Sequence, residues 1–261
     1  MNDSKPVFIA DSCIGGLSVV KSLWASGSAR RAIFMADYAI NPLGLKSDSE
    51  LALVANHWLK LAASHSDTLI MACNTLSIRY HQLLQASLQL SSLENVISMV
   101  DCFKAMLKAE SQQLANRKVL VIGTEFTANQ DVYPDLLRSA IPGVQVSTAA
   151  ATALERKIAR FQSCQIDDES VINPALRQAM ENTDYAVLAC TCFPMVMDRL
   201  ESLFPGMTFL DPAQYCAGLL KDKGHGQHGH LALRVTGEVV SKRSVSEFAK
   251  SYLQEGSLIA E

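Results

Sequence analysis

The chain has 261 residues, of which 49% are apolar and 19% charged, and its formal net charge is −3. A slightly acidic chain without a basic stripe is not expected to bind nucleic acid, and no apolar run approaches the roughly 20 residues of a membrane helix. The N-terminus also lacks the apolar core of a signal peptide. We therefore expect a cytoplasmic protein that has one large domain or two modest ones.

The first segment of the chain combines a strand pattern with a loop suited to a small ligand. Residues 7–10 are apolar and predict a central strand, and a helical pattern begins at Leu17 and stops at Gly27. Between them lie Asp11, Ser12 and the paired glycines 15 and 16. A carboxylate, a hydroxyl and glycines after a strand are what such a loop needs. The alternative is that Asp11 or Ser12 only caps the helix.

The following segments alternate in the same way. Residues 32–36 predict a second strand, and a loop with Asn41-Pro42-Leu43-Gly44 follows it. A capping box at Ser47-Asp48-Ser49-Glu50 predicts the start of the next helix. Residues 68–72 and 96–100 are apolar and predict two more strands. Strands that alternate with helices favour a parallel sheet covered on both faces.

The pattern then repeats. Strands are predicted at residues 118–122, 144–147, 185–189 and 209–210, and helices around 154–161, 171–180 and 245–253. The turn at residues 123–127 corresponds to the turn at 11–16. We therefore predict an α/β fold with two similar parallel-sheet domains that face each other, with the site between them. Residues 1–98 plus 209–261 would form the first domain and 99–208 the second, and the last helix is expected to pack on the first.

Two stretches resemble each other closely. Residues 68–75 and 185–192 each form an apolar run that ends in Ala-Cys and small polar residues, so Cys73 and Cys190 lie where a strand ends and a helix begins. Such a position favours a thiolate. A racemase without a cofactor must remove the α-proton on one face of an amino acid and return a proton on the other. Two facing thiols, one as base and one as acid, suit that task, although a strand ending in Cys is not rare.

Six motifs then carry a resemblance to a known family. They are Asp11-Ser12-x-Ile14-Gly15-Gly16-Leu17-Ser18-Val19, Pro42-x-Gly44, Ala72-Cys73-Asn74-Thr75, Gly123-Thr124-x-x-Thr127, Leu154-Glu155 and Cys190-Thr191-x-Phe193-Pro194. In this order and spacing the chain resembles glutamate racemase and, more broadly, the cofactor-independent aspartate/glutamate racemases.

The resemblance implies roles for individual residues. Cys73 and Cys190 would be the acid/base pair, with Asp11 supporting Cys73 and Glu155 on the Cys190 side. The substrate-binding residues would be Ser12, Pro42, Leu43, Gly44, Asn74, Thr75, Thr124, Thr127, Thr191 and Cys192, with the backbone of residues 42–44 meeting the distal carboxylate. The resemblance also implies no pyridoxal phosphate, no metal, a homodimer, and the supply of D-glutamate for cell-wall peptidoglycan.

Three residues depart from the family pattern inside the expected site. Cys192 stands where the family usually has a His that serves the second cysteine, Leu43 replaces a Tyr, and Cys13 replaces a Gly. A Cβ at position 13 would shift the loop if the backbone there required a positive φ. These departures leave open a different or broader amino-acid substrate, or a racemase-like protein with little activity that binds a ligand or a partner.

The remaining cysteines and histidines raise a metal alternative. The chain has 7 cysteines, an odd number without a disulfide framework, and free thiols are expected. Cys102, Cys164 and Cys216 have no motif around them and are predicted to be buried. Cys13, Cys73, Cys190 and Cys192 could converge as a zinc-like set, but their spacing is not that of a zinc ribbon. His225, His228 and His230 have no acidic or cysteine partner nearby, which disfavours a site there.

Overall fold

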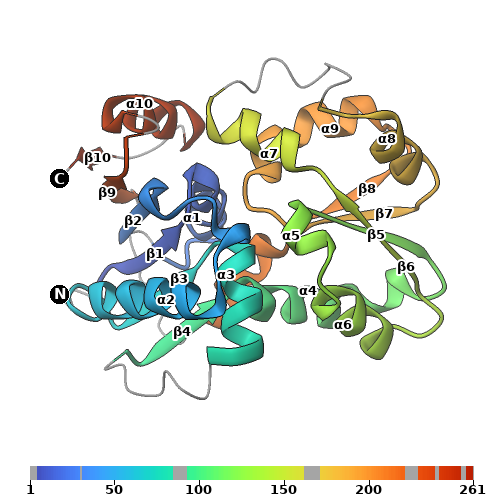
Figure 1. Ribbon diagram of the computed structural model, residues 1–261, viewed down its shortest axis with the longest axis horizontal. Coiled ribbons are helices and arrows are strands. Elements are labelled where there is room, and N and C mark those ends of the chain that lie inside the picture. The colour runs from blue at the N-terminus through green and yellow to red at the C-terminus, as the bar shows by residue number, and fades with distance from the viewer. Residues whose placement is uncertain are drawn as a thin grey trace.

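Two α/β halves lie side by side in the computed structural model (Figure 1). It describes residues 5–29, 31–84, 93–161, 171–220, 229–238, 241–253 and 257–260. Every strand pair in these ranges is parallel. The predicted α/β class with two parallel sheets is therefore confirmed.

The first sheet is built around β1 (Val7–Asp11), whose five residues are all buried. Its order is β10-β9-β2-β1-β3-β4, with β2 (Arg31–Asp37), β3 (Thr68–Met71), β4 (Asn95–Ser98), β9 (His230–Thr236) and β10 (Ser257–Ala260). The helices of this half are α1 (Leu17–Ala25), α2 (Asp48–Ala63), α3 (Asn74–Arg79) and α10 (Lys242–Leu253). The predicted capping box is present at the start of α2, and α10 packs on α1 and β9 as expected.

The second sheet repeats the strand order of the first. It runs β6-β5-β7-β8, with β5 (Lys118–Gly123), β6 (Gln145–Ala150), β7 (Tyr185–Leu188) and β8 (Thr208–Leu210). The helices are α4 (Met99–Leu114), α5 (Glu125–Ala128), α6 (Val132–Ala140), α7 (Thr152–Ala159), α8 (Pro174–Glu181) and α9 (Met197–Leu203). This order matches β2-β1-β3-β4, so Cys73 and Cys190 follow equivalent strands of the two sheets. The internal repeat in the sequence is thus a structural repeat.

Two predicted elements have different limits in the structure. The apolar run at 96–100 is not one strand, because β4 ends at Ser98 and α4 begins at Met99. Ser98 and Asp101 form a capping box there, and the resulting helix buries Met99 and Val100. Similarly, Val171 and Ile172 precede α8, whose start is fixed by the side chain of Asn173. The turn at 123–127 contains the short helix α5.

The chain crosses from the second sheet back to the first between β8 and β9, and this crossing changes one of the proposed domain limits. β8 pairs with β7, so residues 209 and 210 belong to the second sheet, and β9 brings the chain back to the first. The 3-10 helix at Pro212–Leu219 (η7) lies between these strands and packs against α4. We keep the two-domain division as a proposal, with β8 added to the second domain.

The apolar core continues from one half into the other. Ile14, which follows β1, and Phe193, which follows β7, are both fully buried in the same cluster. Cys102 and Cys216 are also buried, as predicted, whereas Cys164, His225 and His228 lie outside the described residues. No helix in the described ranges is long and apolar enough to cross a membrane.

Candidate active site

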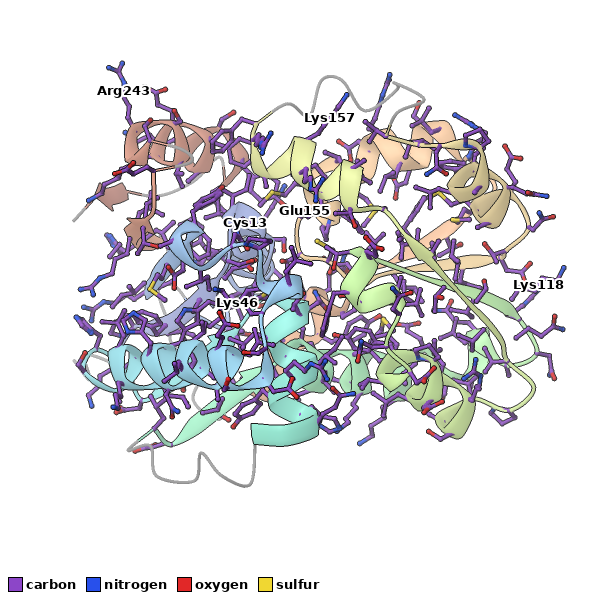
Figure 2. The ribbon with its side chains drawn as sticks, in the orientation of Figure 1. Cys13, Lys46, Lys118, Glu155, Lys157 and Arg243 are labelled. Carbon is purple, nitrogen blue, oxygen red and sulfur yellow. The ribbon has the colours of Figure 1, made fainter. Side chains whose placement is uncertain are left out.

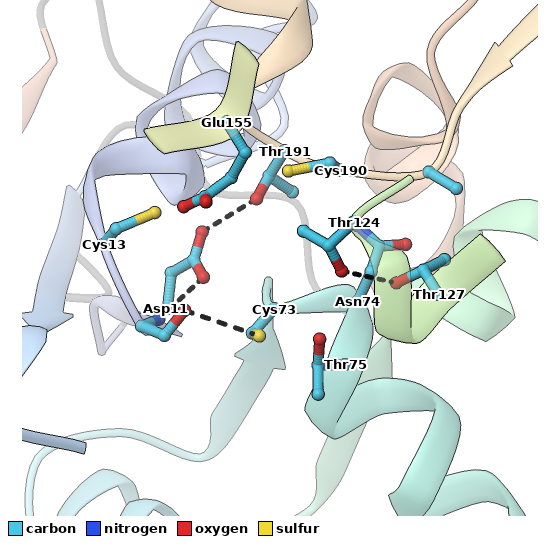
Figure 3. A pocket seen from close by; sticks show the side chains of 12 residues that line it. Asp11, Cys13, Cys73, Asn74, Thr75, Thr124, Thr127, Glu155, Cys190 and Thr191 are labelled. Carbon is cyan, nitrogen blue, oxygen red and sulfur yellow. Dashed lines mark hydrogen bonds between the residues drawn. The ribbon is translucent and has the colours of Figure 1, made fainter. Parts of the chain in front are cut away.

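The two cysteines selected from the sequence line one small cavity between the halves. The cavity has a volume of about 40 Å³. It is lined by Asp11, Ser12, Cys13, Cys73, Asn74, Thr75, Thr124, Thr127, Glu155, Ala189, Cys190 and Thr191. Figure 3 shows Cys73 entering from the first half and Cys190 from the second. This grouping follows from the parallel sheets, because the loops at the carboxyl ends of β1, β3, β5 and β7 converge here.

Cys73 lies at the N-cap of α3 and is buried. The hydroxyl oxygen of Ser12 lies 3.6 Å from its sulfur. Burial raises the pKa of the Cys73 thiol above its ordinary value, and the nearby Asp11 carboxylate raises it further. Hydrogen bonds from Ser12 and from the backbone of Leu76 act in the opposite direction, because they favour the thiolate.

Asp11 joins the two halves. Its carboxylate accepts hydrogen bonds from the hydroxyl of Thr191 at 2.8 Å and from the backbone N–H of Ser12 at 2.7 Å (Figure 3). Burial raises the pKa of Asp11 to about 6, although these hydrogen bonds lower it. Asp11 therefore bonds to the residue that follows Cys190, while Ser12 makes the direct contact with Cys73.

The approach of the two loops depends on a glycine. A Cβ at Gly15 would lie 2.4 Å from the Thr191 hydroxyl oxygen, 2.8 Å from an Asp11 carboxylate oxygen and 2.9 Å from the Cys192 backbone nitrogen. No side chain fits at these distances. Gly15 is thus required for the contact between the β1 and β7 loops.

Glu155 lies in the first turn of α7 and is half-buried. Burial and the Asp11 charge raise the pKa of Glu155 to about 7, and Arg156 and Arg160 oppose this shift. The carboxylate is close to the sulfurs of Cys13 and Cys192. Glu155 therefore lies beside Cys13 and Cys192, and its assignment to the Cys190 side stays a prediction.

Asn74 presents a free hydrogen-bond donor at the cavity wall. The hydroxyl of Tyr133, in α6, donates to the Asn74 Oδ1 atom at 2.6 Å. This bond leaves the buried Nδ2 of Asn74 without a partner among the described residues. Hydroxyls of Thr124 and Thr127, whose oxygens are 3.4 Å apart, line the same cavity. Tyr133 had no signal in the sequence, because it lies 59 positions from its partner.

A second, larger cavity of about 520 Å³ shares Ser12, Thr75, Thr124 and Glu155 with the first. Its other lining residues are Asn41, Pro42, Leu43, Gly44, Leu45, Lys46, Arg79, Glu125, Phe126, Asn129, Gln130, Thr152 and Arg156. The expected residues 42–44 thus line this outer cavity. The basic residues of its wall were not selected from the sequence, where they occur as isolated charges.

Two of the three departures from the family pattern contact each other. The sulfurs of Cys13 and Cys192 are 3.3 Å apart. Cys13 has a φ of −156°, which is extended backbone, so its Cβ causes no strain. Cys192 is fully buried, and neither cavity is lined by it in the described part of the chain. The predicted contact of Cys192 with substrate therefore stays a prediction, which the lining of the two cavities does not support.

Both of these thiols have raised pKa values, and burial contributes to each shift. A hydrogen bond with Cys192 lowers the pKa of Cys13, but burial and the charges of Asp11 and Glu155 outweigh it and raise this pKa to about 11. Hydrogen bonds with Cys13 and Cys190, together with burial, raise the pKa of Cys192 well above its ordinary value.

Comparisons with known proteins point to one family. The model of the Asp/Glu/Hydantoin racemase family matches residues 36–220. The glutamate racemase of Chlorobaculum parvum is 27% identical in an alignment of 237 positions that covers 85% of this chain and 80% of that protein. The glutamate racemase of Latilactobacillus sakei is 26% identical in an alignment of 267 positions that covers 98% of this chain and 94% of that protein.

Solved structures share the fold. The crystal structure of glutamate racemase isoform RacE1 from Bacillus anthracis has a TM-score of 0.75 and 20% identity, and the match covers 100% of this chain and 98% of that one. The glutamate racemase of Francisella tularensis, solved in complex with D-glutamate, has a TM-score of 0.71 and 20% identity, and the match covers 99% of this chain and 97% of that one.

Proposed function

The chain belongs to the Asp/Glu/Hydantoin racemase family, and we propose that it is a cofactor-independent racemase that interconverts L- and D-glutamate with two cysteines. The observation that carries this proposal is that Cys73 and Cys190 line one cavity from equivalent strands of the two sheets. Two thiols on opposite sides of a planar carbanion-like transition state suit racemisation, because the proton leaves one face and a proton arrives at the other.

In the proposed reaction each thiol serves one direction. For one enantiomer the Cys73 thiolate takes the α-proton while the Cys190 thiol donates its proton to the opposite face, and for the other enantiomer the roles are reversed. Ser12, 3.6 Å from the Cys73 sulfur, supports the thiolate by hydrogen bonding. Glu155 is the charged group on the side of Cys190 and acts as its positioning partner.

Polar groups around the thiols suit an amino acid. The free Nδ2 of Asn74 is a donor for the α-carboxylate. The hydroxyls of Thr75, Thr124 and Thr127 can donate to the α-carboxylate or accept from the α-ammonium. The hydroxyl of Thr191 donates to Asp11, so its oxygen can only accept from the α-ammonium. These groups would hold the α-carbon between the two sulfurs, so that the proton transfers are within hydrogen-bond reach.

The outer cavity favours an acidic side chain on the substrate. Lys46, Arg79 and Arg156 line it, against the two acidic residues Glu125 and Glu155. Lys46 and Arg79 also form ion pairs with Glu50 at 3.8 Å and Asp48 at 3.4 Å, so their charge is partly neutralised. We propose that the distal carboxylate of glutamate binds here, next to the backbone of residues 42–44.

The experiment that tests the activity is hydrogen exchange at the α-carbon in D2O, followed by NMR over a panel of amino acids. We expect glutamate of either configuration to lose its α-hydrogen signal fastest. The absence of exchange across the panel would instead favour a racemase-like binding protein, the alternative motivated by Cys192.

A broader substrate range has a specific observation in its favour. The side chain of Leu43 lines the outer cavity and supplies an apolar contact in place of a hydroxyl. If this contact sets the specificity, glutamine and methionine should exchange in D2O at rates similar to that of glutamate. A strong preference for glutamate would exclude this alternative.

The family resemblance also supports proposals for the oligomeric state, the location and the metabolic role of the enzyme. We propose that it forms a homodimer in the cytoplasm and supplies D-glutamate for peptidoglycan. Light scattering of the purified protein tests the dimer, and D-glutamate dependence of a cell that lacks the gene tests the role.

A further inference from the structure

Three potential metal ligands meet at the junction of the two halves. The sulfurs of Cys13 and Cys192 are 3.3 Å apart. Together with a carboxylate oxygen of Glu155, these ligand atoms all lie within 4.8 Å of one another. Within the described ranges this is the one such group, and Figure 2 shows Cys13 and Glu155 at the junction. Cys73 and Cys190 are outside it, so the set of four thiolates considered from the sequence does not form.

The distances suit a tetrahedral d10 cation. Zinc binds thiolate sulfur at about 2.3 Å and carboxylate oxygen at about 2.0 Å, so two of its sulfur ligands lie about 3.8 Å apart. The observed distance between the two sulfurs, 3.3 Å, is shorter than this value, and the carboxylate oxygen lies within 4.8 Å of both sulfurs. Side-chain movements would bring the three atoms into place. Binding would release two thiol protons, and the two thiolates and the carboxylate together would outweigh the charge of a divalent cation by one negative charge.

The site also has access and an open position. Cys13 and Glu155 line the inner cavity, while Cys192 is buried behind them. A cation could therefore enter from the cavity, and the fourth ligand would be a water or a substrate carboxylate on that side. Three protein ligands with one open position are a common arrangement for zinc.

We propose that Cys13, Cys192 and Glu155 form a binding site for a zinc-class cation, which links the two halves and inhibits racemisation. Inhibition follows because the ion would occupy the cavity wall and withdraw Glu155 from the Cys190 side. Cation binding itself does not rest on the proposed function, whereas the inhibition does. The two residues that depart from the family pattern would then act together as ligands.

The chain contains a matched control for a pair of buried thiols. Cys102 and Cys216 are fully buried and hydrogen-bonded to each other, like Cys13 and Cys192. They belong to no group of three potential ligands in the part of the chain that the structure describes. If a pair of thiols were enough to bind the cation, it would bind at both pairs. If the carboxylate is also needed, it should bind only at Cys13 and Cys192.

Titration of the reduced, metal-free protein with cadmium tests the site, because thiolate-to-cadmium charge transfer absorbs in the ultraviolet. We expect one equivalent to give this band and zinc to abolish it by competition. Cys13→Ser and Cys192→Ser should each remove the band, and Cys102→Ala should retain it. Glu155→Gln should weaken cadmium binding by more than the roughly 10–100-fold that loss of an outer-shell partner costs.

Several results would overturn the proposal. The wild-type titration needs no variant, so a missing band or two equivalents bound with equal affinity would contradict the site even if a variant failed to fold. A charge-transfer band that persists in Cys192→Ser, or that is lost in Cys102→Ala, would also contradict the site. If cadmium and zinc bind as expected but racemisation continues unchanged with one equivalent of zinc, the inhibitory part is wrong. If the ion binds and no amino acid is racemised in its absence, the proposed function fails and the metal site stands.

Discussion

Cys192 occupies a fully buried position next to Cys13, and this limits which side chains can replace it. A histidine is larger, and its ring would meet the Cys13 sulfur, which now lies 3.3 Å from that of Cys192. Overpacking of this kind costs about 1–3 kcal/mol. The two positions must therefore change together, because Cys13→Gly makes the room that Cys192→His requires.

We predict that the double variant Cys13→Gly/Cys192→His racemises glutamate faster than the wild type, since it restores a proton partner for Cys190. The single variant Cys192→His should gain less and should unfold at a lower temperature. Chiral chromatography of the product and thermal unfolding measure the two effects. Equal or lower turnover of the double variant would count against a role for a histidine here.

The two thiols at the cavity should be individually indispensable. A positioned acid or base typically contributes about 10²–10⁴-fold to a rate, so Cys73→Ala and Cys190→Ala should each reduce kcat by at least about 100-fold. Cys102→Ala, which removes a buried thiol outside the cavity, should leave kcat near the wild-type value. Initial rates of racemisation decide this, and a single alanine variant that retains activity would remove that residue from the mechanism.

Tyr133 is predicted to act through Asn74. Its hydroxyl fixes the orientation of the amide, so that Nδ2 is directed away from the tyrosine and is free for substrate. Because a buried hydrogen bond contributes about 0.5–1.5 kcal/mol, Tyr133→Phe should raise KM by roughly twofold to tenfold with a smaller change in kcat. Steady-state kinetics separate the two parameters. A loss confined to kcat would place the interaction in the transition state and contradict a role in substrate binding. A loss of stability with both kinetic parameters unchanged would mean that the tyrosine is only structural.

At the scale of elements, the junction between β8 and η7 contains a buried carboxyl group. Asp211 caps η7 by accepting a hydrogen bond from the backbone N–H of Ala213 at 2.9 Å. Burial raises the pKa of Asp211 from 3.8 to about 7, and the Ala213 bond only partly opposes the shift. The protonated form is thus favoured in the folded state. Its stabilising contribution is fully present below pH 3.8 and is lost as the pH rises through 7.

We predict that Asp211→Asn removes this pH dependence. The amide oxygen can still accept the Ala213 hydrogen bond but cannot ionise, so wild type and variant should have similar stability near pH 4. Near pH 8 the variant should be more stable, by an amount on the order of 4 kcal/mol, since each pKa unit corresponds to about 1.4 kcal/mol. Urea unfolding at both pH values measures the difference. A variant with the same pH dependence as the wild type would contradict the account of Asp211.

The elements also show where sequence reasoning was sufficient. The capping box at Ser47 was recognised and is present, while the equivalent one at Ser98 and Asp101 was missed because apolar residues continue across the boundary. Strand ends at Cys73 and Cys190 were predictable from local pattern and family motifs. The Tyr133–Asn74 bond and the Cys13–Cys192 contact were not, because each joins residues far apart in the sequence.

At the scale of the whole molecule, the repeated strand order accounts for the site. Each sheet brings its cysteine to the carboxyl end of an equivalent strand, and the bond from Thr191 to Asp11 joins the two loops across the junction. The repeat was visible in the sequence as two copies of strand, turn, helix, strand and Ala-Cys. How the copies face each other depends on the contacts of Gly15 and on the shared core, which only the structure reveals.

The most direct test of two opposed thiols is to follow each glutamate enantiomer in D2O at early times, by mass spectrometry after chiral separation. If one thiol removes the proton and the other supplies a deuteron, the product should contain deuterium while the recovered substrate remains protonated. This result is predicted for both directions of the reaction. Deuterium appearing at equal rates in substrate and product would show a single base that serves both faces, and would contradict the opposed pair of Cys73 and Cys190.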